Sequence, residues 1–405
     1  MYLDEEERNV LEGKMGEGLA TAMKILVAIG KAFNAEKMVK VGRAHISLSN
    51  QEGDLWFVEK LVKQGAICNI PATVNPAFDL KYFSNICNFN STSEEIQMLQ
   101  STLVAYRDIG VIPTYNCTPY FENNVPRFKE VVAFAASGAS CFVNSVYGAR
   151  TNRESSQSAL CAAITGKTPL YGLLLERNRK GTALVEVEAE IKSEYDYQLL
   201  GHCTPRKLNN EIPVFIGLSG EPKVEHLMNL STQLNVHGVV PMFHIINITP
   251  EAGTLDDAFH GEQPREKIRI TEEDIRKTRE QISQGAGEIA FVVLGCPHLT
   301  IPQIQEVARL VKNKELKTEL WIFTSSLNKE LACRMGLEET INNAGGYIVG
   351  DSCVDQPIWD HLKGKVGLTE SPKCAYYVAR RNMKLLVRSI PECIEAAIRG
   401  KVEWQ

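Results

Sequence analysis

Three cysteines of this 405-residue chain stand where an apolar run gives way to a loop. Cys117 follows the β-type run in DIGVIPTYNC, Cys296 follows EIAFVVLG, and Cys353 follows AGGYIVGDS. A cysteine that only fills a core would normally lie inside the apolar run, where it packs as a small hydrophobic residue. Ligands of open α/β sheets bind beyond the carboxyl ends of the strands. We therefore expect these three thiols, far apart in sequence, to converge in space.

Three converging thiolates are a donor set for a soft metal centre. They suit an iron–sulfur cluster or another thiolate-rich site, and a site one ligand short of four leaves a position open for water or substrate. The alternative is that they are ordinary half-buried cysteines, because the chain has no CxxC pair or other short cysteine spacing. The spacing alone leaves both interpretations open.

Polar residues follow other runs that we interpret as strands. Ser49 follows VGRAHIS, Asn75 follows IPATV, and CFV at 141–143 leads into a polar group. The residues of that last group that could hold a carboxylate are Asn144, Ser145 and Arg150. Each residue alone is typical of a loop. Together they predict a polar, mildly cationic pocket for a small anionic substrate.

The elements that must position these residues alternate between helix and strand patterns. Residues 17–33 carry apolar side chains at helical spacing, a β-type run follows at 38–50, and 54–66 is helical again with Gly65 as a candidate C-cap. Such alternation predicts an α/β fold with mostly parallel sheets and helices on both faces. The length suggests two or three lobes, with an internal boundary near residues 185–210.

Composition and charge narrow the class of protein. The net charge is −5 with acids and bases interleaved, which gives no electrostatic reason to expect nucleic acid or an anionic membrane as a partner. The acidic start MYLDEEERNV differs from a signal peptide, and no apolar run approaches the ~20 residues of a membrane span. Eleven cysteines, an odd number, argue against a disulfide framework. A soluble cytoplasmic protein with reduced thiols is expected.

Seven separated motifs resemble the catalytic region of aconitase X. In chain order they are YNCTPY, VNSVYGARTNRE, TGKTPLYGLLLE, NITPEA, LGCPH, GDSCVD and SPKCAYY. The resemblance covers nearly the whole chain, so residues 1–405 are expected to form one aconitase X catalytic region with an aconitase-like, multi-lobed α/β/α fold. It implies a dehydratase that removes water from a small hydroxy acid. It also implies a separate small subunit that carries the swivelling domain of aconitases, a domain we do not expect in this chain.

The resemblance assigns roles to individual residues. The cluster-binding cysteines would be Cys117, Cys296 and Cys353, and [4Fe–4S], [2Fe–2S] and a single iron all suit three cysteines. An iron with an open position would act as Lewis acid on the substrate hydroxyl. The substrate-binding positions that the resemblance implies are Ser49, Asn75, Pro76, Asn144, Ser145 and Lys373. Arg150, from the polar group after residues 141–143, is added to them as a candidate. Lys373 and Ser145 are the candidate catalytic residues, and a serine base on the partner is the alternative to Ser145.

One departure from the family bears on the substrate. The turn after AHIS reads Leu48-Ser49-Asn50, whereas archaeal phosphomevalonate dehydratases of the family carry a Gly-Val-Ser type turn there. The expected substrate is therefore cis-3-hydroxy-L-proline, with (R)-5-phosphomevalonate as the alternative. A non-catalytic metal-binding scaffold subunit is a further alternative, which the polar loops disfavour because a structural metal site would not need them.

Overall fold

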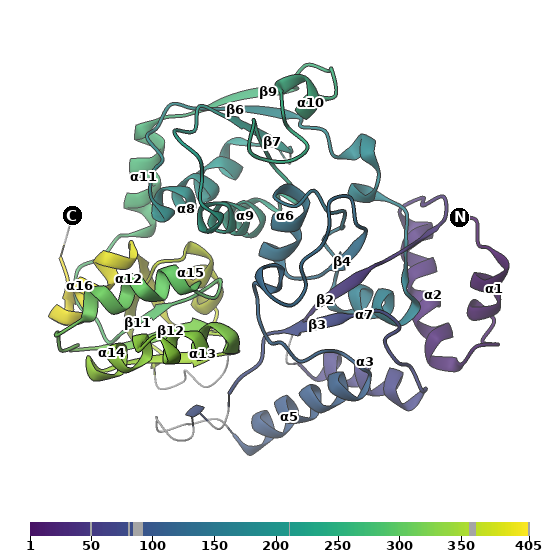
Figure 1. Cartoon of the computed structure of the whole chain (residues 1–405), viewed down its shortest axis with the longest axis horizontal. Coiled ribbons are helices and arrows are strands. Elements are labelled where there is room, and N and C mark those ends of the chain that lie inside the picture. Colours follow the sequence, from purple (N-terminus) through teal and green to yellow (C-terminus); the bar gives the residue numbers. More distant parts are fainter. Residues whose placement is uncertain (49–50, 80–81, 84–91, 210, 356–361, 404–405) are drawn as a thin grey trace.

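Three parallel sheets, arranged one after another along the chain, organise the molecule (Figure 1). The structure is a computed structural model that describes residues 1–48, 51–79, 82–83, 92–209, 211–355 and 362–403. Each sheet is covered by the helices that connect its strands, so the molecule has three lobes. The expected α/β fold with mostly parallel sheets is confirmed.

The first lobe contains the sheet β3-β2-β4, in which Ser47 at the end of β2 lies opposite Asn75 at the end of β3. Helix α7 packs on β2, and α2 packs on α7. A short antiparallel pair, β1 and β5, closes the lobe. The elements are α1 (Glu5–Leu11), α2 (Glu17–Ala32), β1 (Met38–Lys40), β2 (Arg43–Ser47), α3 (Glu52–Lys63), β3 (Ala72–Asn75), α5 (Ser93–Asp108), β4 (Val132–Phe134), α6 (Ser137–Ser145), α7 (Ser156–Thr165) and β5 (Lys167–Pro169).

The second lobe contains the sheet β8-β7-β6-β9 and lies at the top of Figure 1. Its helices α8 and α9 pack on each other, and α6 of the first lobe packs on α9. One continuous core, which includes Phe134 and Phe142 on one side and Leu199 and Leu230 on the other, therefore joins the first two lobes. The elements are β6 (Ala183–Val187), α8 (Glu194–Cys203), β7 (Pro213–Ile216), α9 (Val224–Gly238), β8 (His244–Ile245), α10 (Leu255–Phe259), β9 (Glu266–Ile270) and α11 (Glu272–Ile282).

The third lobe contains the sheet β13-β12-β11-β14-β15. The chain winds outward from β11 to β13, then returns to the other side of β11 for β14 and β15, and every pairing is parallel. The elements are β10 (Gly287–Glu288), β11 (Phe291–Leu294), α12 (Ile301–Val311), β12 (Glu319–Thr324), α13 (Ser326–Arg334), α14 (Leu337–Asn343), β13 (Gly346–Gly350), β14 (Val366–Thr369), α15 (Pro372–Ala379), β15 (Lys384–Val387), α16 (Ile390–Arg399) and β16 (Lys401–Val402).

Two local expectations differ from the structure. Residues 141–143 do not form a strand but lie inside helix α6, in which every residue from Gly138 to Ser145 is buried. A short helix that is buried all round lacks the polar stripe of a surface helix, so its apolar run looks like a buried strand. The run before Cys117 forms only an isolated bridge, between Ile112 and Thr73.

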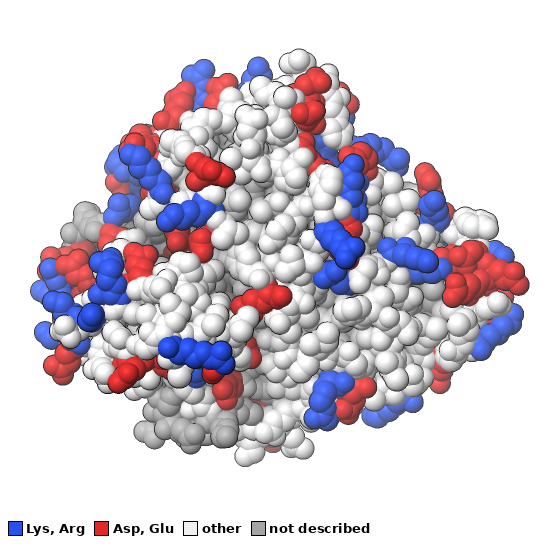
Figure 2. Space-filling model, viewed as in Figure 1, with Lys and Arg blue, Asp and Glu red and all other residues white. Residues whose placement is uncertain are grey.

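The surface carries both charge signs. On the face drawn in Figure 2, acidic and basic side chains alternate around the rim, while the middle is largely uncharged. Within the described residues, no helix combines the length and the apolar character that crossing a bilayer requires.

Candidate active site

A cavity of about 210 Å³ lies between the first and third lobes and contains all three predicted cysteines. Most of its walls come from strand ends of both lobes and from the segments that follow them. The first lobe contributes Ser47, Leu48, Asn75, Pro76, Cys117, Ala136, Ser137 and Gly138. The third lobe contributes Gly295, Cys296, His298, Ser352, Cys353, Val354, Asp355, Lys373, Tyr377 and Arg380.

The cavity lies where two sheets reverse their winding. The strand order changes direction between β2 and β4 in the first sheet and between β11 and β14 in the third. Such a switch point leaves a crevice beyond the carboxyl ends of the strands, because the connecting helices depart to opposite sides. Leu48 follows β2, Ser137 follows β4, Cys296 follows β11 and Lys373 follows β14. The convergence expected from the strand ends thus has a topological cause.

Helix α6 begins at the cavity. Ser137 and Gly138 are its first two residues, and Ala136 at the N-cap offers no side-chain hydrogen bond to them. The first backbone N–H groups of a helix have no partner within the helix, and they carry the positive end of its dipole. The cavity therefore contains donors suited to an anionic group.

Cys117 is held by a residue of the opposite lobe. The backbone N–H of His298 donates to Cys117 Sγ over 3.2 Å. The His298 ring donates from Nε2 to the carbonyl oxygen of Ser352 (2.8 Å), and its Nδ1 faces Asn116 Oδ1 (3.3 Å). Asn116 Oδ1 is an acceptor, because the Asn116 amide nitrogen bonds Glu122. Both ring nitrogens therefore face acceptors, which favours the doubly protonated cation.

The charges around these residues stabilise one another. Burial lowers the pKa of His298, but the Cys117 thiolate outweighs burial and raises it to about 9. Burial likewise raises the pKa of Cys117, yet His298 and Lys373 bring it down to about 7. For Lys373, burial is outweighed by the thiolates of Cys296 and Cys117, so its pKa is raised. Cys117 is therefore readily ionised, with two cations beside it.

The loop of Cys296 is fixed by the residues that follow β14. A carboxylate oxygen of Glu370 accepts from the backbone N–H of Gly295 (2.8 Å) and of Cys296 (3.4 Å). The hydroxyl of Ser371 donates to the carbonyl oxygen of Cys296. A hydrogen bond from the Cys374 thiol lowers the pKa of Cys296. Hydrogen bonds thus fix the backbone around Cys296, and a further hydrogen bond stabilises its thiolate sulfur.

Cys353 differs from the other two. Burial is the main influence on its thiol and raises its pKa. The backbone N–H of Asp355 donates to its sulfur over 3.4 Å. Without a bound positive centre, Cys353 is therefore the least ionised of the three.

The residues fit a thiolate-bound centre in the chemistry of their donors. Three cysteines face one cavity, and Lys373 and His298 offset the negative charge that bound thiolates bring. In the described part of the chain, no group of three or more His, Cys, Asp or Glu side chains is arranged to hold a single ion. The thiolates of a [4Fe–4S] cluster each bind a different iron, so they need not lie as close together as the ligands of one ion.

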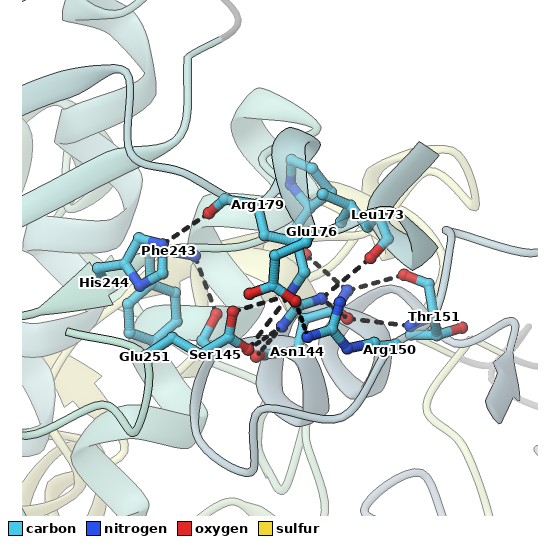
Figure 3. A network of polar contacts seen from close by, with 11 residues as sticks. Asn144, Ser145, Arg150, Thr151, Leu173, Glu176, Arg179, Phe243, His244 and Glu251 are labelled. Atoms are coloured by element: carbon cyan, nitrogen blue, oxygen red, sulfur yellow. Dashed lines mark hydrogen bonds and ion pairs between the residues drawn. The ribbon is translucent and has the colours of Figure 1, made fainter. Parts of the chain in front are cut away.

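Three predicted substrate residues lie away from the cavity, in a buried polar network (Figure 3). Asn144 Nδ2 donates to the carbonyls of Thr151 (2.9 Å) and Pro241 (3.2 Å), and its Oδ1 accepts from the Thr151 N–H (3.0 Å) and from Arg179 (3.1 Å). Protein partners therefore satisfy both ends of the Asn144 amide.

Ser145 and Arg150 have partners in the same region. Ser145 Oγ accepts from the backbone N–H of Phe243 (2.9 Å), and the Arg150 guanidinium pairs with Glu176. The helix explains why Asn144 and Ser145 miss the cavity. They lie at the C-terminal end of α6, about 12 Å along the axis from its first residue, and it is the first turn that lines the cavity. Ser49 lies outside the described residues, so nothing is added to its prediction.

Several residues that line the cavity were not predicted from the sequence, among them Ser137 and Gly138. The signal that could have found them is the same strand-end rule, applied to VVAF before Ala135. Others, such as Asp355, Tyr377 and Arg380, follow no strand directly and had no local signal.

Comparisons with known proteins agree with this architecture. Models described as the first, second and third domains of aconitase X match residues 1–177, 181–280 and 289–399. The phosphomevalonate dehydratase large subunit of Thermococcus kodakarensis is 34% identical, over 98% of this chain and 100% of its own length. The cis-3-hydroxy-L-proline dehydratase of Pseudomonas aeruginosa is 31% identical, over 98% of this chain and 70% of its own length.

A solved structure extends the likeness to three dimensions. Thermococcus kodakaraensis aconitase X in its holo-form superposes with a TM-score of 0.89 at 32% identity, and the match covers 98% of this chain and 100% of that one. The resemblance seen in the seven motifs is confirmed: the chain is a hydro-lyase and belongs to the aconitase X family.

Proposed function

We propose that this chain is the large, catalytic subunit of a dehydratase that removes water from a small hydroxy acid in the cavity between its first and third lobes. One observation carries the proposal. Cys117, Cys296 and Cys353 come from three separate segments, yet they line the same cavity as Lys373 and Asn75. A scaffold that held a metal only for stability would need the thiols but not the lysine and the amide.

The three cysteines would hold an iron–sulfur cluster of the [4Fe–4S] or [2Fe–2S] type, which supplies a Lewis acid for the departing hydroxyl. The remaining chemistry belongs to the protein. Loss of the α-proton builds negative charge on the substrate carboxylate. Lys373 would pair with that charge, and Asn75 and the first N–H groups of α6 would donate to it. Such donors stabilise the carbanion-like state more than the ground state.

The base that takes the α-proton is proposed to come from a small partner subunit. The Asp355 carboxylate on the cavity wall pairs with Arg380 and with Arg381 (2.8 Å), and both ring nitrogens of His298 face acceptors. Ser145, the candidate from the sequence, does not line the cavity. The family relatives named large subunits support the existence of such a partner.

For the substrate we place (R)-5-phosphomevalonate first and cis-3-hydroxy-L-proline second, the reverse of the order expected from the turn at 48–50. Relatives named for phosphomevalonate are 28–35% identical and are matched over 94–100% of their own length, whereas those named for hydroxyproline are 28–31% identical and are matched over 69–70% of theirs. Arg380 on the cavity wall shares the Asp355 carboxylate with Arg381, so this group keeps a net positive charge that, in addition to Lys373, could pair with the second anionic group of a substrate.

The test is turnover by anaerobically purified protein that is co-purified with its small subunit. Iron and sulfide are quantified, and loss of one water from each substrate is followed by mass spectrometry. Cys296→Ser should abolish turnover, while Cys333→Ser, an exposed cysteine of α13, should leave it unchanged. Dehydration of neither substrate by a cluster-loaded complex would overturn the proposal. Dehydration of only one would settle the order.

A further inference from the structure

The Asn75 side chain faces the cavity with one end of its amide and is bound to the protein by the other. Asn75 lies at the end of β3 and is 6% exposed. Its Oδ1 is 2.7 Å from Nε2 of His45, a fully buried residue of β2. Its Nδ2 donates no hydrogen bond to any residue that the structure describes. An Asn amide can also bind in the flipped orientation, which would turn its carbonyl oxygen toward the substrate. The contacts behind Asn75 therefore decide whether the cavity presents a donor or an acceptor.

A chain of hydrogen bonds behind Asn75 begins at Asn124. The Asn124 Nδ2 donates to the carbonyl oxygen of Ala44 (2.7 Å) and to Thr73 Oγ1 (2.8 Å). A backbone carbonyl can only accept, so the end of the amide near Ala44 must be the NH₂ group. Since Thr73 Oγ1 accepts from Asn124, its own proton is free to point elsewhere. A hydroxyl oxygen can accept twice, but in the described part of the chain no other atom is placed to take the Thr73 proton, so Nδ1 of His45, which lies 2.8 Å away, is assigned as its acceptor.

The protonation of His45 follows from this chain. Burial lowers the pKa of His45 to about 4, although the hydrogen bond to Asn75 opposes the shift, so the ring is neutral near pH 7. A neutral imidazole carries one proton, and a ring whose Nδ1 accepts must carry that proton on Nε2. Nε2 therefore donates to Asn75 Oδ1. Every step from Asn124 to Asn75 has a donor facing an acceptor.

We infer that His45 is a positioning residue of the substrate site: the chain Asn124–Thr73–His45–Asn75 holds the Asn75 amide with its NH₂ group toward the cavity, where it donates to an anionic group of the substrate. The role of Asn75 toward a substrate rests on the proposed function. The proton arrangement of His45 does not, and it can be measured in the protein without substrate.

The first measurement is the tautomer of His45 by NMR of protein labelled with ¹⁵N-histidine. The chain has eight histidines, and His45→Gln identifies the signal that belongs to His45. The expected result between pH 6 and 8 is a neutral ring with its proton on Nε2. Thr73→Val, which keeps the side-chain shape but removes the donor to Nδ1, should lose this fixed tautomer. A proton on Nδ1, or a charged ring at pH 7, would overturn the inference whatever the enzyme's substrate.

The second measurement separates a positioning role from a merely structural one. With the substrate that is turned over, His45→Leu should raise KM at least tenfold while iron content per chain stays at the wild-type level. His45→Gln, which can still donate from the Nε2 position, should stay within about threefold of wild type. In an Asn75→Ala background, His45→Leu should have no further effect on KM, because the residue through which it acts is already gone.

Controls keep the result interpretable. His244→Leu removes another buried histidine, which bonds the Arg179 carbonyl away from the cavity, and it should leave KM unchanged. If His45→Leu does not fold, Thr73→Val provides the same comparison with a smaller change. Additive effects of His45→Leu and Asn75→Ala on KM, or a Thr73→Val variant with unchanged tautomer and KM, would overturn the inference.

Discussion

The backbone N–H of His298, which follows β11 in the third lobe, lies 3.2 Å from Sγ of Cys117 in the first. This contact joins the two lobes at the thiol itself. The His298 ring also donates a hydrogen bond to the carbonyl oxygen of Ser352, the residue before Cys353. The geometry of the three thiols therefore depends on one histidine that binds the loops around two of them.

His298→Ala should raise the pKa of the Cys117 thiol. His298 and Lys373 together hold that pKa at about 7 against burial, and His298 contributes more than Lys373, so its removal lets burial raise the pKa. The thiolate absorbance of cluster-free protein should then titrate at higher pH than in wild type. His260→Ala, which changes a histidine beside α10, is the control. An unchanged thiolate titration in His298→Ala would contradict this account of the site.

Glu370→Leu should destabilise the third lobe by about 1–3 kcal/mol, because it leaves the buried N–H groups of Gly295 and Cys296 without their acceptor. Glu370→Gln keeps an acceptor oxygen and should cost less. Urea denaturation of cluster-free protein measures both. Equal losses for the two variants would mean that the carboxylate acts by its charge and not as an acceptor of these bonds.

Asn144→Ala should lower stability and leave KM unchanged, whereas Asn75→Ala should raise KM. The reason is that the Asn144 amide binds only protein groups, while Asn75 faces the cavity. Thermal denaturation and steady-state kinetics of the two variants make the comparison. A raised KM in Asn144→Ala would return this residue to the substrate site, where the sequence placed it.

Arg179→Leu should destabilise by about 3–5 kcal/mol, because Arg179 is fully buried and its loss leaves the Glu251 carboxylate uncompensated. The matched control is Arg269→Leu at an exposed pair with Glu186, where about 0–1 kcal/mol is expected. Urea denaturation gives both values. A cost for Arg179→Leu no larger than that of the control would contradict a structural role for the network in Figure 3.

Acid should destabilise the protein through His202 and His237, which lie in the last turns of α8 and α9. The centroids of their rings are 4.1 Å apart. Burial lowers the pKa of His202 to about 3 and of His237 to about 4, with Arg206 adding to both shifts. Unfolded histidine binds a proton near pH 6.5. Between pH 6.5 and 4 the unfolded state therefore binds more protons, and the free energy of unfolding falls as the pH falls.

Urea midpoints measured from pH 7 to pH 4.5 check this dependence. The double variant His202→Gln, His237→Gln should show a shallower fall than wild type over that range. Identical slopes would mean that other groups govern the acid sensitivity.

Cys296 and Cys353 could be found from the sequence because each follows a parallel strand of the third sheet, and strand ends are visible in local apolar patterns. Cys117 lines the same cavity although its run forms only a bridge. Asn144 and Ser145 lie in α6, outside that cavity, and the sequence pattern suggested a strand end there because α6 is buried on all sides and shows no helical stripe. The fold class follows from alternating elements, which are local features.

What the sequence could not show depends on contacts between lobes and on strand register. The pairing of His45 with Thr73 and Asn75 requires β2 and β3 to lie in one particular register, with His45 opposite Thr73. The meeting of Cys117 with His298 requires the first and third lobes to face each other. Neither relation leaves a periodic signal along the chain.

The division of the thiols between lobes has a consequence for biosynthesis. Cys117 leaves the ribosome early, but Cys296 and Cys353 follow only after the whole second lobe has been made. A nascent chain or a fragment that ends before the third lobe has one of the three thiols and none of the lysine that accompanies them. Any centre that binds all three can therefore be inserted only after Cys353 has been made, and it would link the first lobe to the third.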